Sequence, residues 1–288
     1  MLTVKKLLTS LLTVSLTLAA AEDQSEAPPA QPAQTPGAPS IPADLLEDEH
    51  VREELAINEF TAPSISRIFD SLKSLAPLPL ADYPREVPER MPLDRADLAV
   101  ELGFLIADGF LVVQVGELGK VEELAGQLTR YAKALGAGDR VTRHAASLLD
   151  SAKKGNVEQL KKELAATQKD VELELVTLRD ADLAHLISIG GWIRALEVAS
   201  GAVDKQFSPE RARQIMREDI ADYYSAIIGS LEPRIAEREN YIEMQTVLSG
   251  MRLEMLIEEG QEPTPEKVAE IRKQASKLVE LSLMRAKP

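Results

Sequence analysis

The chain has 288 residues, a formal net charge of −14 and no cysteine. The lack of cysteine excludes disulfides, thiol nucleophiles, thiolate-bound metals and lipidated cysteines. The acidic excess disfavours nucleic acids and anionic membrane surfaces as partners, because both repel a net anion.

Composition and patterning predict an all-α protein. Hydrophobic residues make up 44% of the chain and aromatic residues only 4%, so an aliphatic core is expected. Strong helix formers are abundant, and no segment shows the alternation of a strand. We therefore expect an antiparallel helical bundle of roughly seven to nine helices. It should form a single domain from residue 44 to residue 288.

The N-terminus has the pattern of a secretory signal peptide, residues 1–21. Two lysines, Lys5 and Lys6, precede a short apolar run at 7–18 and three alanines at 19–21. The run is too short to span a bilayer comfortably, which argues against a retained anchor. A periplasmic or secreted location is therefore expected, with no integral membrane segment after cleavage. The Pro- and Ala-rich linker at 22–43 cannot bury a core, and is either a spacer or a simple disordered leader.

Two short helices and a proline-rich strap are predicted next. Residues 44–60 read as an acidic helix, and residues 64–75 as a short helix opened by Pro63. Five prolines between positions 77 and 92 exclude a helix or a central strand there. We expect residues 77–92 to cross the surface as an extended strap.

The remaining chain reads as long helices separated by turns. The predicted helices are 94–115, 121–135, 140–154, 157–178, 182–203, 209 to about 231, 233 to about 259, and 265 onward. A G-x-V-E-x-L pattern begins at Gly119 and again at Gly155, an offset of 155 − 119 = 36 residues. This weak repeat favours helical hairpins.

Two of these helices carry stripes of small residues. On residues 182–203, which hold Trp192 and the adjacent Gly190 and Gly191, the stripe is Ala184, Ser188, Gly191, Ala195, Ala199 and Ala202. On residues 94–115 it is Ala96, Ala99, Gly103 and Ala107. Each glycine costs a helix about 1 kcal/mol relative to alanine, so tight packing is expected to compensate. We predict that the stripes face each other, with Gly103 near Gly191; alternatively, each meets a different neighbour.

The helix at 94–115 also carries an acidic stripe. Asp94 is its expected N-cap, and Asp94, Asp97, Glu101 and Asp108 fall within about 60° of one another. One interpretation is a site for a cation or a cationic ligand. The preferred interpretation is the solvated edge of a mostly buried helix, because charged stripes usually face water.

Metal-binding chemistry has an incomplete motif. Asp182-x-x-His185 resembles half of the ligand set of a carboxylate-bridged di-iron bundle. The other helical histidine, His144, has Val141 three residues before it, so no second pair exists. Glu101, Asp108, Asp182 and His185 are candidate ligands on this basis, and no cofactor is predicted. Alternatively, His185 is a hydrogen-bonded structural histidine.

A pocket lined by Trp192, Arg194 and Glu197 is a further candidate site. Alternatively, Trp192 belongs to the core, and Arg194 pairs with Glu197 three residues on. No nucleophile motif is present, so the sequence favours a protein that is not an enzyme.

The expected function is that of an exported helical protein that acts by binding or scaffolding. Its partner would be a protein or a small ligand of the cell envelope. The alternative is a ligand- or metal-binding bundle, which could be an enzyme, with an acidic/His cluster between its central helices.

Overall fold

Every regular element in the described part of the protein is helical, which confirms the predicted all-α class. The computed structural model describes residues 68–70 and 72–286, within a unit that begins at Pro39. The predicted signal peptide, the linker and the acidic helix at 44–60 lie outside these residues. The α-helices are α4 (Arg95–Gln114), α5 (Val121–Leu135), α6 (Gly138–Lys153), α7 (Val157–Thr177), α8 (Ala181–Lys205), α9 (Pro209–Ile215), α10 (Glu218–Ser230), α11 (Pro233–Ala236), α12 (Glu239–Met255) and α13 (Pro265–Ser282).

Three short 3-10 helices complete the described elements: η1 (Leu72–Leu75), η2 (Leu80–Asp82) and η3 (Leu118–Lys120). Residues 68–70 are helical, so the helix predicted at 64–75 is described only in its second half. Apart from η2, residues 77–92 form no regular element, as their prolines predict.

Helix ends follow the local signals in the sequence. The side chains of Asp94, Ser208 and Thr264 each accept a hydrogen bond from an amide in the first turn of α4, α9 and α13. Such caps satisfy amides that have no partner within the helix. At the other end of two helices, Gly136 (φ 97°) and Gly155 (φ 66°) adopt the left-handed backbone that glycine tolerates best.

Two predicted helices are each divided in two. The helix expected from 209 to 231 stops at Ile215 and restarts at Glu218, and the one expected from 233 to 259 is split into α11 and α12. Neither break contains glycine or proline, so local propensity offered no signal. At the second break Arg238 is the N-cap residue, and its guanidinium bonds to Asp97 on α4. A tertiary ion pair therefore coincides with the loss of helical continuity there.

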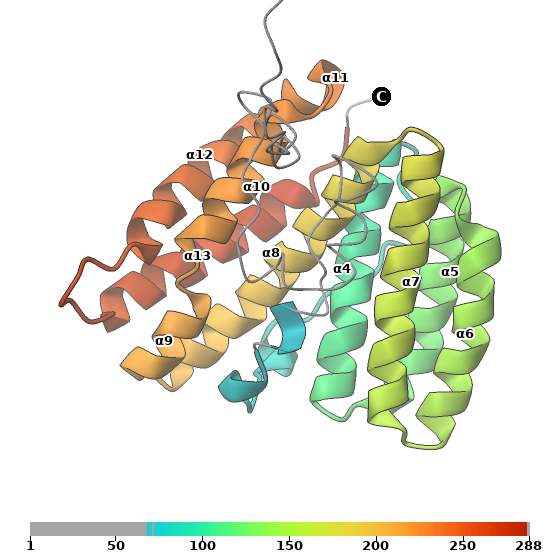
Figure 1. Ribbon diagram of the computed structural model, residues 1–288, viewed down its shortest axis with the longest axis horizontal. Helices are drawn as coiled ribbons and strands as arrows, with labels where there is room; N and C mark the ends of the chain where they lie inside the picture. The colour runs from blue at the N-terminus through green and yellow to red at the C-terminus, as the bar shows by residue number, and fades with distance from the viewer. Residues whose placement is uncertain (1–67, 71, 287–288) are drawn as a thin grey trace, which may run out of the picture. The chain divides into compact units, whose positions relative to one another are not determined.

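α8 lies between two groups of helices (Figure 1). On one side α4, α5, α6 and α7 pack as successive neighbours, and on the other side α13 contacts α8 while α12 packs against α13 and α10. The most extensive helix–helix contact in the described residues joins α4 to α8. Val100 lies beside Gly190 and Asp108 bonds to Arg194, so these two helices run in the same direction, unlike the antiparallel arrangement expected.

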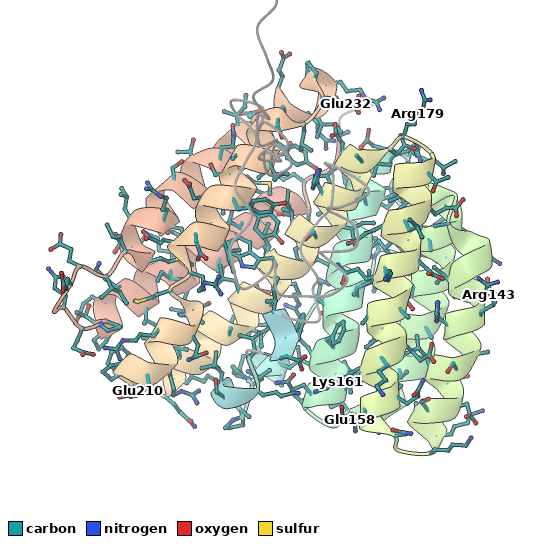
Figure 2. The ribbon with its side chains drawn as sticks, in the orientation of Figure 1. Arg143, Glu158, Lys161, Arg179, Glu210 and Glu232 are labelled. Carbon is teal, nitrogen blue, oxygen red and sulfur yellow. The ribbon has the colours of Figure 1, made fainter. Side chains whose placement is uncertain are left out.

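Both central helices are buried on all sides. Every residue of α4 from Ala96 to Val113 and every residue of α8 from Leu183 to Val203 is buried. By contrast, outer helices show one buried face: Val141 and Leu148 of α6 point inward while Arg143 is exposed (Figure 2). By length and composition α8 could cross a membrane, but its whole apolar stretch is buried within the protein, as in the core helix of a soluble protein.

The backbones of α4 and α8 touch at glycines. A β-carbon on Gly103 would lie 2.0 Å from the carbonyl oxygen of Ile187 and 2.9 Å from the amide nitrogen of Gly191. One on Gly190 would lie 2.4 Å from the carbonyl oxygen of Val100. The predicted proximity of Gly103 and Gly191 is thus confirmed. The α8 stripe is nevertheless shared, because Ser188 bonds instead to Tyr224 on α10 (2.8 Å).

Candidate functional site

Three of the four acids of the α4 stripe are buried, so the preferred interpretation of a solvated edge is wrong for them; only Asp94, with a side chain 42% exposed, lies at the surface. Asp97 is 3% exposed, Glu101 0% and Asp108 9%. Burying carboxylates is tolerated when each is paired and hydrogen-bonded. Arginines from four distant segments supply those partners: Arg85, Arg194, Arg238 and Arg285.

The middle of the stripe is held by two buried arginines. Arg85, from the proline-rich strap, donates from Nε to Oδ2 of Asp108 (2.7 Å) and forms an ion pair with Glu101. Arg194 of α8 donates from Nε to the other oxygen of Asp108 (2.7 Å). Burial opposes the charge of Arg85, but the two carboxylates outweigh burial and raise the pKa of this arginine. These contacts fasten the strap and α8 to α4.

The three residues of the predicted pocket, Trp192, Arg194 and Glu197, are all buried. Arg194 donates to Glu197 (2.5 Å) and to the backbone carbonyl of Tyr83 (2.8 Å), which confirms the expected Arg194–Glu197 pair. Burial raises the pKa of Glu197, against the effect of Arg194. Trp192 is 4% exposed, and its ring lies 5.1 Å from that of Tyr224. All three residues therefore have neighbours within the protein: Arg194 pairs with Glu197, and Trp192 packs against Tyr224.

The N-terminal part of the stripe binds the C-terminal segment and the start of α12. Arg285 donates to Glu101 (2.7 Å), and the amide of Ala286 donates to Asp97 (2.8 Å). Arg238 donates to Asp97 (2.5 Å) and, more weakly, to Asp94 (3.2 Å). The beginning of α4 is thus bonded to two segments, at Arg238 and at residues 285–286, each more than a hundred residues away from it in the sequence.

Of the four candidate metal ligands, Glu101, Asp108 and Asp182 bond to other groups of the protein, and His185 is buried. Glu101 and Asp108 are brought together through Arg85, whereas Asp182 accepts a hydrogen bond from the amide of Glu232 (2.8 Å). Burial lowers the pKa of His185 to about 4, although the charge of Asp182 opposes this shift. Among residues 68–70 and 72–286, no group of three or more histidine, aspartate or glutamate side chains is placed to hold a metal ion.

His144 joins α6 to α7 in an arrangement that the sequence analysis missed. Its Nδ1 lies 2.8 Å from Glu163 and its Nε2 lies 3.2 Å from Asp170. Ser147 also donates to Glu163 (2.6 Å). The spacing of 170 − 163 = 7 residues, two helical turns, places both acids on one face of α7.

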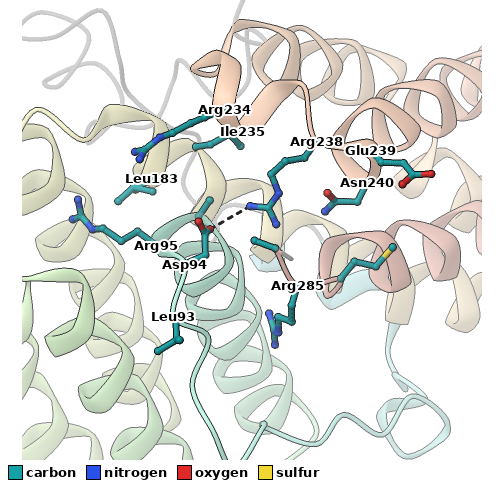
Figure 3. A pocket seen from close by; sticks show the side chains of 13 residues that line it. Leu93, Asp94, Arg95, Leu183, Arg234, Ile235, Arg238, Glu239, Asn240 and Arg285 are labelled. Atoms are coloured by element: carbon teal, nitrogen blue, oxygen red, sulfur yellow. Dashed lines mark hydrogen bonds and ion pairs between the residues drawn. The ribbon is translucent and has the colours of Figure 1, made fainter. Parts of the chain in front are cut away.

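A cavity of about 580 Å³ opens where α4 and α12 begin, beside the first turn of α8 (Figure 3). Four arginines and two acidic residues are part of its lining. The full lining is Leu93, Asp94, Arg95, Ala96, Leu183, Arg234, Ile235, Arg238, Glu239, Asn240, Met284, Arg285 and Ala286.

The cavity arginines differ in how tightly they are held. Arg238 and Arg285 have side chains 16% and 34% exposed and pair with the buried Asp97 and Glu101. Arg95 and Arg234 are 43% and 75% exposed. Their partners, Asp180 and Glu232, are themselves partly exposed, and such surface pairs contribute little to stability. The ion pairs of these two guanidinium groups can therefore exchange at low cost; Arg95 also donates to the backbone carbonyl of Leu135 (3.2 Å).

Helix polarity adds to the positive character of the cavity. α4 and α12 are 20 and 17 residues long, and both begin at its wall. The N-terminal end of a helix carries a partial positive charge and unpaired amides, which favour anions. The lining has four arginines against two acids, in a chain of net charge −14, and each of these arginines also pairs with an acid just outside the lining.

Of the arginines that pair with the α4 stripe, sequence patterns pointed only to Arg194, and they pointed to none of the four arginines that line the cavity. An available signal was the acidic stripe itself, because acids on an otherwise apolar helix require cationic partners once the helix is buried. Which arginines supply them depends on chain segments far apart in the sequence, and periodicity within one helix carries no such information.

Comparisons with protein-family models, with curated proteins and with solved structures found no match to this chain.

Proposed function

We propose that this is an exported binding protein whose ligand presents an anionic group, such as a carboxylate or a phosphate, to the arginine-lined cavity. The observation that carries the proposal is the gathering of four guanidinium groups at one cavity of a strongly acidic chain. Arginine binds carboxylates and phosphates through paired N–H donors, which suits it to recognition of this kind.

The cavity arginines keep N–H donors that their carboxylate partners do not use. Among the described residues, Arg234 is bonded through Nε to Glu232, and Arg285 through Nη2 to Glu101. A guanidinium has five N–H donors, so both retain donors beyond these bonds. The volume of about 580 Å³ is within the range of cavities that bind small molecules.

Export is the second part of the proposal, and it is supported by the sequence. The lysines at 5 and 6, the apolar run and the three alanines before Glu22 have the order of a cleaved signal. The proline-rich residues 22–43 then suit a linker between the export signal and the folded helices. N-terminal sequencing of protein from the cell-envelope fraction should start at Glu22; an intact Met1 would contradict export by this route.

Binding is tested by isothermal titration with sodium citrate and sodium phosphate at constant ionic strength. Replacing Arg95 and Arg234 together by glutamine should weaken binding of the preferred anion about tenfold or more, because each charge-assisted hydrogen bond contributes about 1.5–3 kcal/mol. The matched control is Arg213→Gln, which removes an exposed arginine paired with Glu262.

The control variant should bind as the unchanged protein does. Equal losses in the cavity variant and in Arg213→Gln would show that binding follows net charge alone and would reject the cavity as the site. No heat of binding for either anion at millimolar concentrations would reject the proposed ligand class.

A further inference from the structure

We infer that the ligand of the cavity is a free amphipathic anion, in which one carboxylate or phosphate is joined to an aliphatic chain. This ligand class rests on the proposed function, because the cavity arginines bind the anionic group. The apolar part of the lining binds the aliphatic chain.

Nearly half of the cavity lining is apolar. Six of its residues have aliphatic or thioether side chains: Leu93, Ala96, Leu183, Ile235, Met284 and Ala286. Leu93 is 99% exposed and Met284 is 50% exposed, and no large hydrophobic residue in the described part of the chain is more exposed than Leu93. Hydrocarbon that displaces water from such side chains gains free energy.

Leu93 is exposed at a position where an apolar side chain often packs against its own helix. It directly precedes Asp94, the N-cap residue of α4. A hydrophobic residue there often contacts the fourth residue of the helix, which is Leu98 in this chain. Leu98 is 4% exposed, so the core covers it, whereas Leu93 stays in solvent. Figure 3 shows Leu93 on the far side of Asp94 from Arg234, so the apolar rim and this guanidinium group are separated, as the two ends of an amphipathic ligand are.

Charge alone gives the cavity little affinity for an anion. The lining holds Asp94 and Glu239 beside its four arginines. Those arginines already pair with four further acids: Asp180, Glu232, Asp97 and Glu101. The anionic group therefore binds by exchange at the exposed pairs of Arg95 and Arg234, where the loss of a partner costs little. Further affinity has to come from apolar contacts.

The volume of the cavity also favours a ligand larger than a small anion. About 580 Å³ corresponds to roughly twenty water molecules at about 30 Å³ each. Acetate or phosphate displaces only a few of these, so the side chains of Leu93 and Met284 stay hydrated. An aliphatic chain attached to the anionic group displaces more water and covers both side chains.

A series of carboxylates measures the apolar contribution. We titrate the full-length chain calorimetrically with sodium acetate, butyrate, hexanoate and octanoate. Affinity should rise at least about fiftyfold from acetate to octanoate, because each buried methylene contributes about fourfold and three of them suffice. Equal affinity along the series would overturn the inference and leave the proposed anion site intact.

The uncharged analogue 1-octanol separates the inference from the proposed function. It should bind at least about tenfold more weakly than octanoate, because it cannot accept charge-assisted hydrogen bonds as a carboxylate does. Octanol that binds as tightly as octanoate would reject the anionic group, and with it the proposed function.

Leu93→Ser tests the apolar rim at a side chain that the fold does not bury. Affinity for octanoate should fall about fivefold or more, while affinity for citrate stays the same. The matched control is Leu253→Ser, at a residue that is 62% exposed on α12 and outside the lining, and it should change neither affinity. Equal losses for octanoate and citrate in Leu93→Ser, or equal losses for octanoate in both variants, would overturn the inference.

Vesicles of phosphatidylglycerol distinguish a free amphiphile from a lipid within a bilayer. The net charge of −14 opposes approach to an anionic surface, so the chain should not sediment with the vesicles. Sedimentation with vesicles that Leu93→Ser abolishes would assign the cavity to a membrane lipid and would overturn the inference of a free ligand.

Discussion

Arginine–carboxylate pairs occur at two places along the α4–α8 pair, and their surroundings differ. In the middle, Asp108 holds Arg85 and Arg194, whose side chains are 6% and 3% exposed. At the N-terminal end, Arg95 and Arg234 pair with acids at the protein surface. The comparison shows that pairs of the same residue types differ in burial; under the proposed function, the exposed pairs are the ones that exchange their partner for a ligand.

The largest effect is expected at the middle, from Asp108→Asn. The change leaves two buried guanidinium groups without their shared carboxylate, and breaking such a pair typically costs about 3–5 kcal/mol in unfolding free energy. Urea denaturation measures the loss. The control is Asp82→Asn, whose ion pair with Lys205 is about half exposed and should contribute less than about 1 kcal/mol. Similar losses for the two variants would contradict the distinction between the two places.

A pH-dependent effect is expected from His185, which is also buried in α8. Its folded pKa of about 4 lies below the ordinary value of 6.5, so the unfolded chain takes up the proton first. Stability is therefore fully present above pH 6.5 and falls as the pH drops toward 4, by about 3 kcal/mol in total. Unfolding free energies measured from pH 7 to pH 4.5 should decline less in His185→Gln; parallel curves would contradict a buried neutral histidine.

The glycine contact should be the next most sensitive feature. Gly103→Ala places a methyl group against the backbone of α8, and overpacking of this kind costs about 1–3 kcal/mol in unfolding free energy. Gly126→Ala is the matched control, because a β-carbon there, in the exposed face of α5, meets nothing within 4 Å. By helix propensity alone it should stabilise the protein by up to about 1 kcal/mol. The midpoint temperature of thermal unfolding should fall for Gly103→Ala and rise for Gly126→Ala.

The smallest effect on stability is expected at the cavity. Arg95→Gln removes a partly exposed pair with Asp180 and a hydrogen bond to the backbone carbonyl of Leu135, at a cost of about 1 kcal/mol in unfolding free energy. Arg95→Gln should instead lower the affinity for the anion, as measured by isothermal titration. A large loss of stability without a change in affinity would place Arg95 with the structural pairs and remove the contrast between the two places.

Local patterns predicted much of the helical framework. The start and end of α5 were predicted to the residue, because a turn precedes Val121 and Gly136 follows Leu135. The approach of Gly103 to Gly191 was also predictable, since small residues at helical spacing favour close packing of two helices. The helix breaks before α10 and α12 could not be predicted, because neither break contains a glycine or proline.

The candidate site was predicted less well than the framework. Periodicity placed Asp97, Glu101 and Asp108 on one face of α4 but assigned that face to solvent, whereas all three are buried. Charge alone cannot distinguish a solvated acid from one that is paired in the interior. The partners Arg85 and Arg285 come from a strap and from the last residues of the chain, and no pattern within one helix links them to α4.

The sequence by itself determined the helical class, most helix limits and the bare faces where α4 and α8 meet, because these depend on residues a few positions apart. Tertiary structure alone decided which arginine meets which carboxylate, and which guanidinium groups remain near the surface around the cavity. The reason is physical: the free energy of a charged group depends on its solvation and on its nearest opposite charges, and both are created only when distant segments pack together.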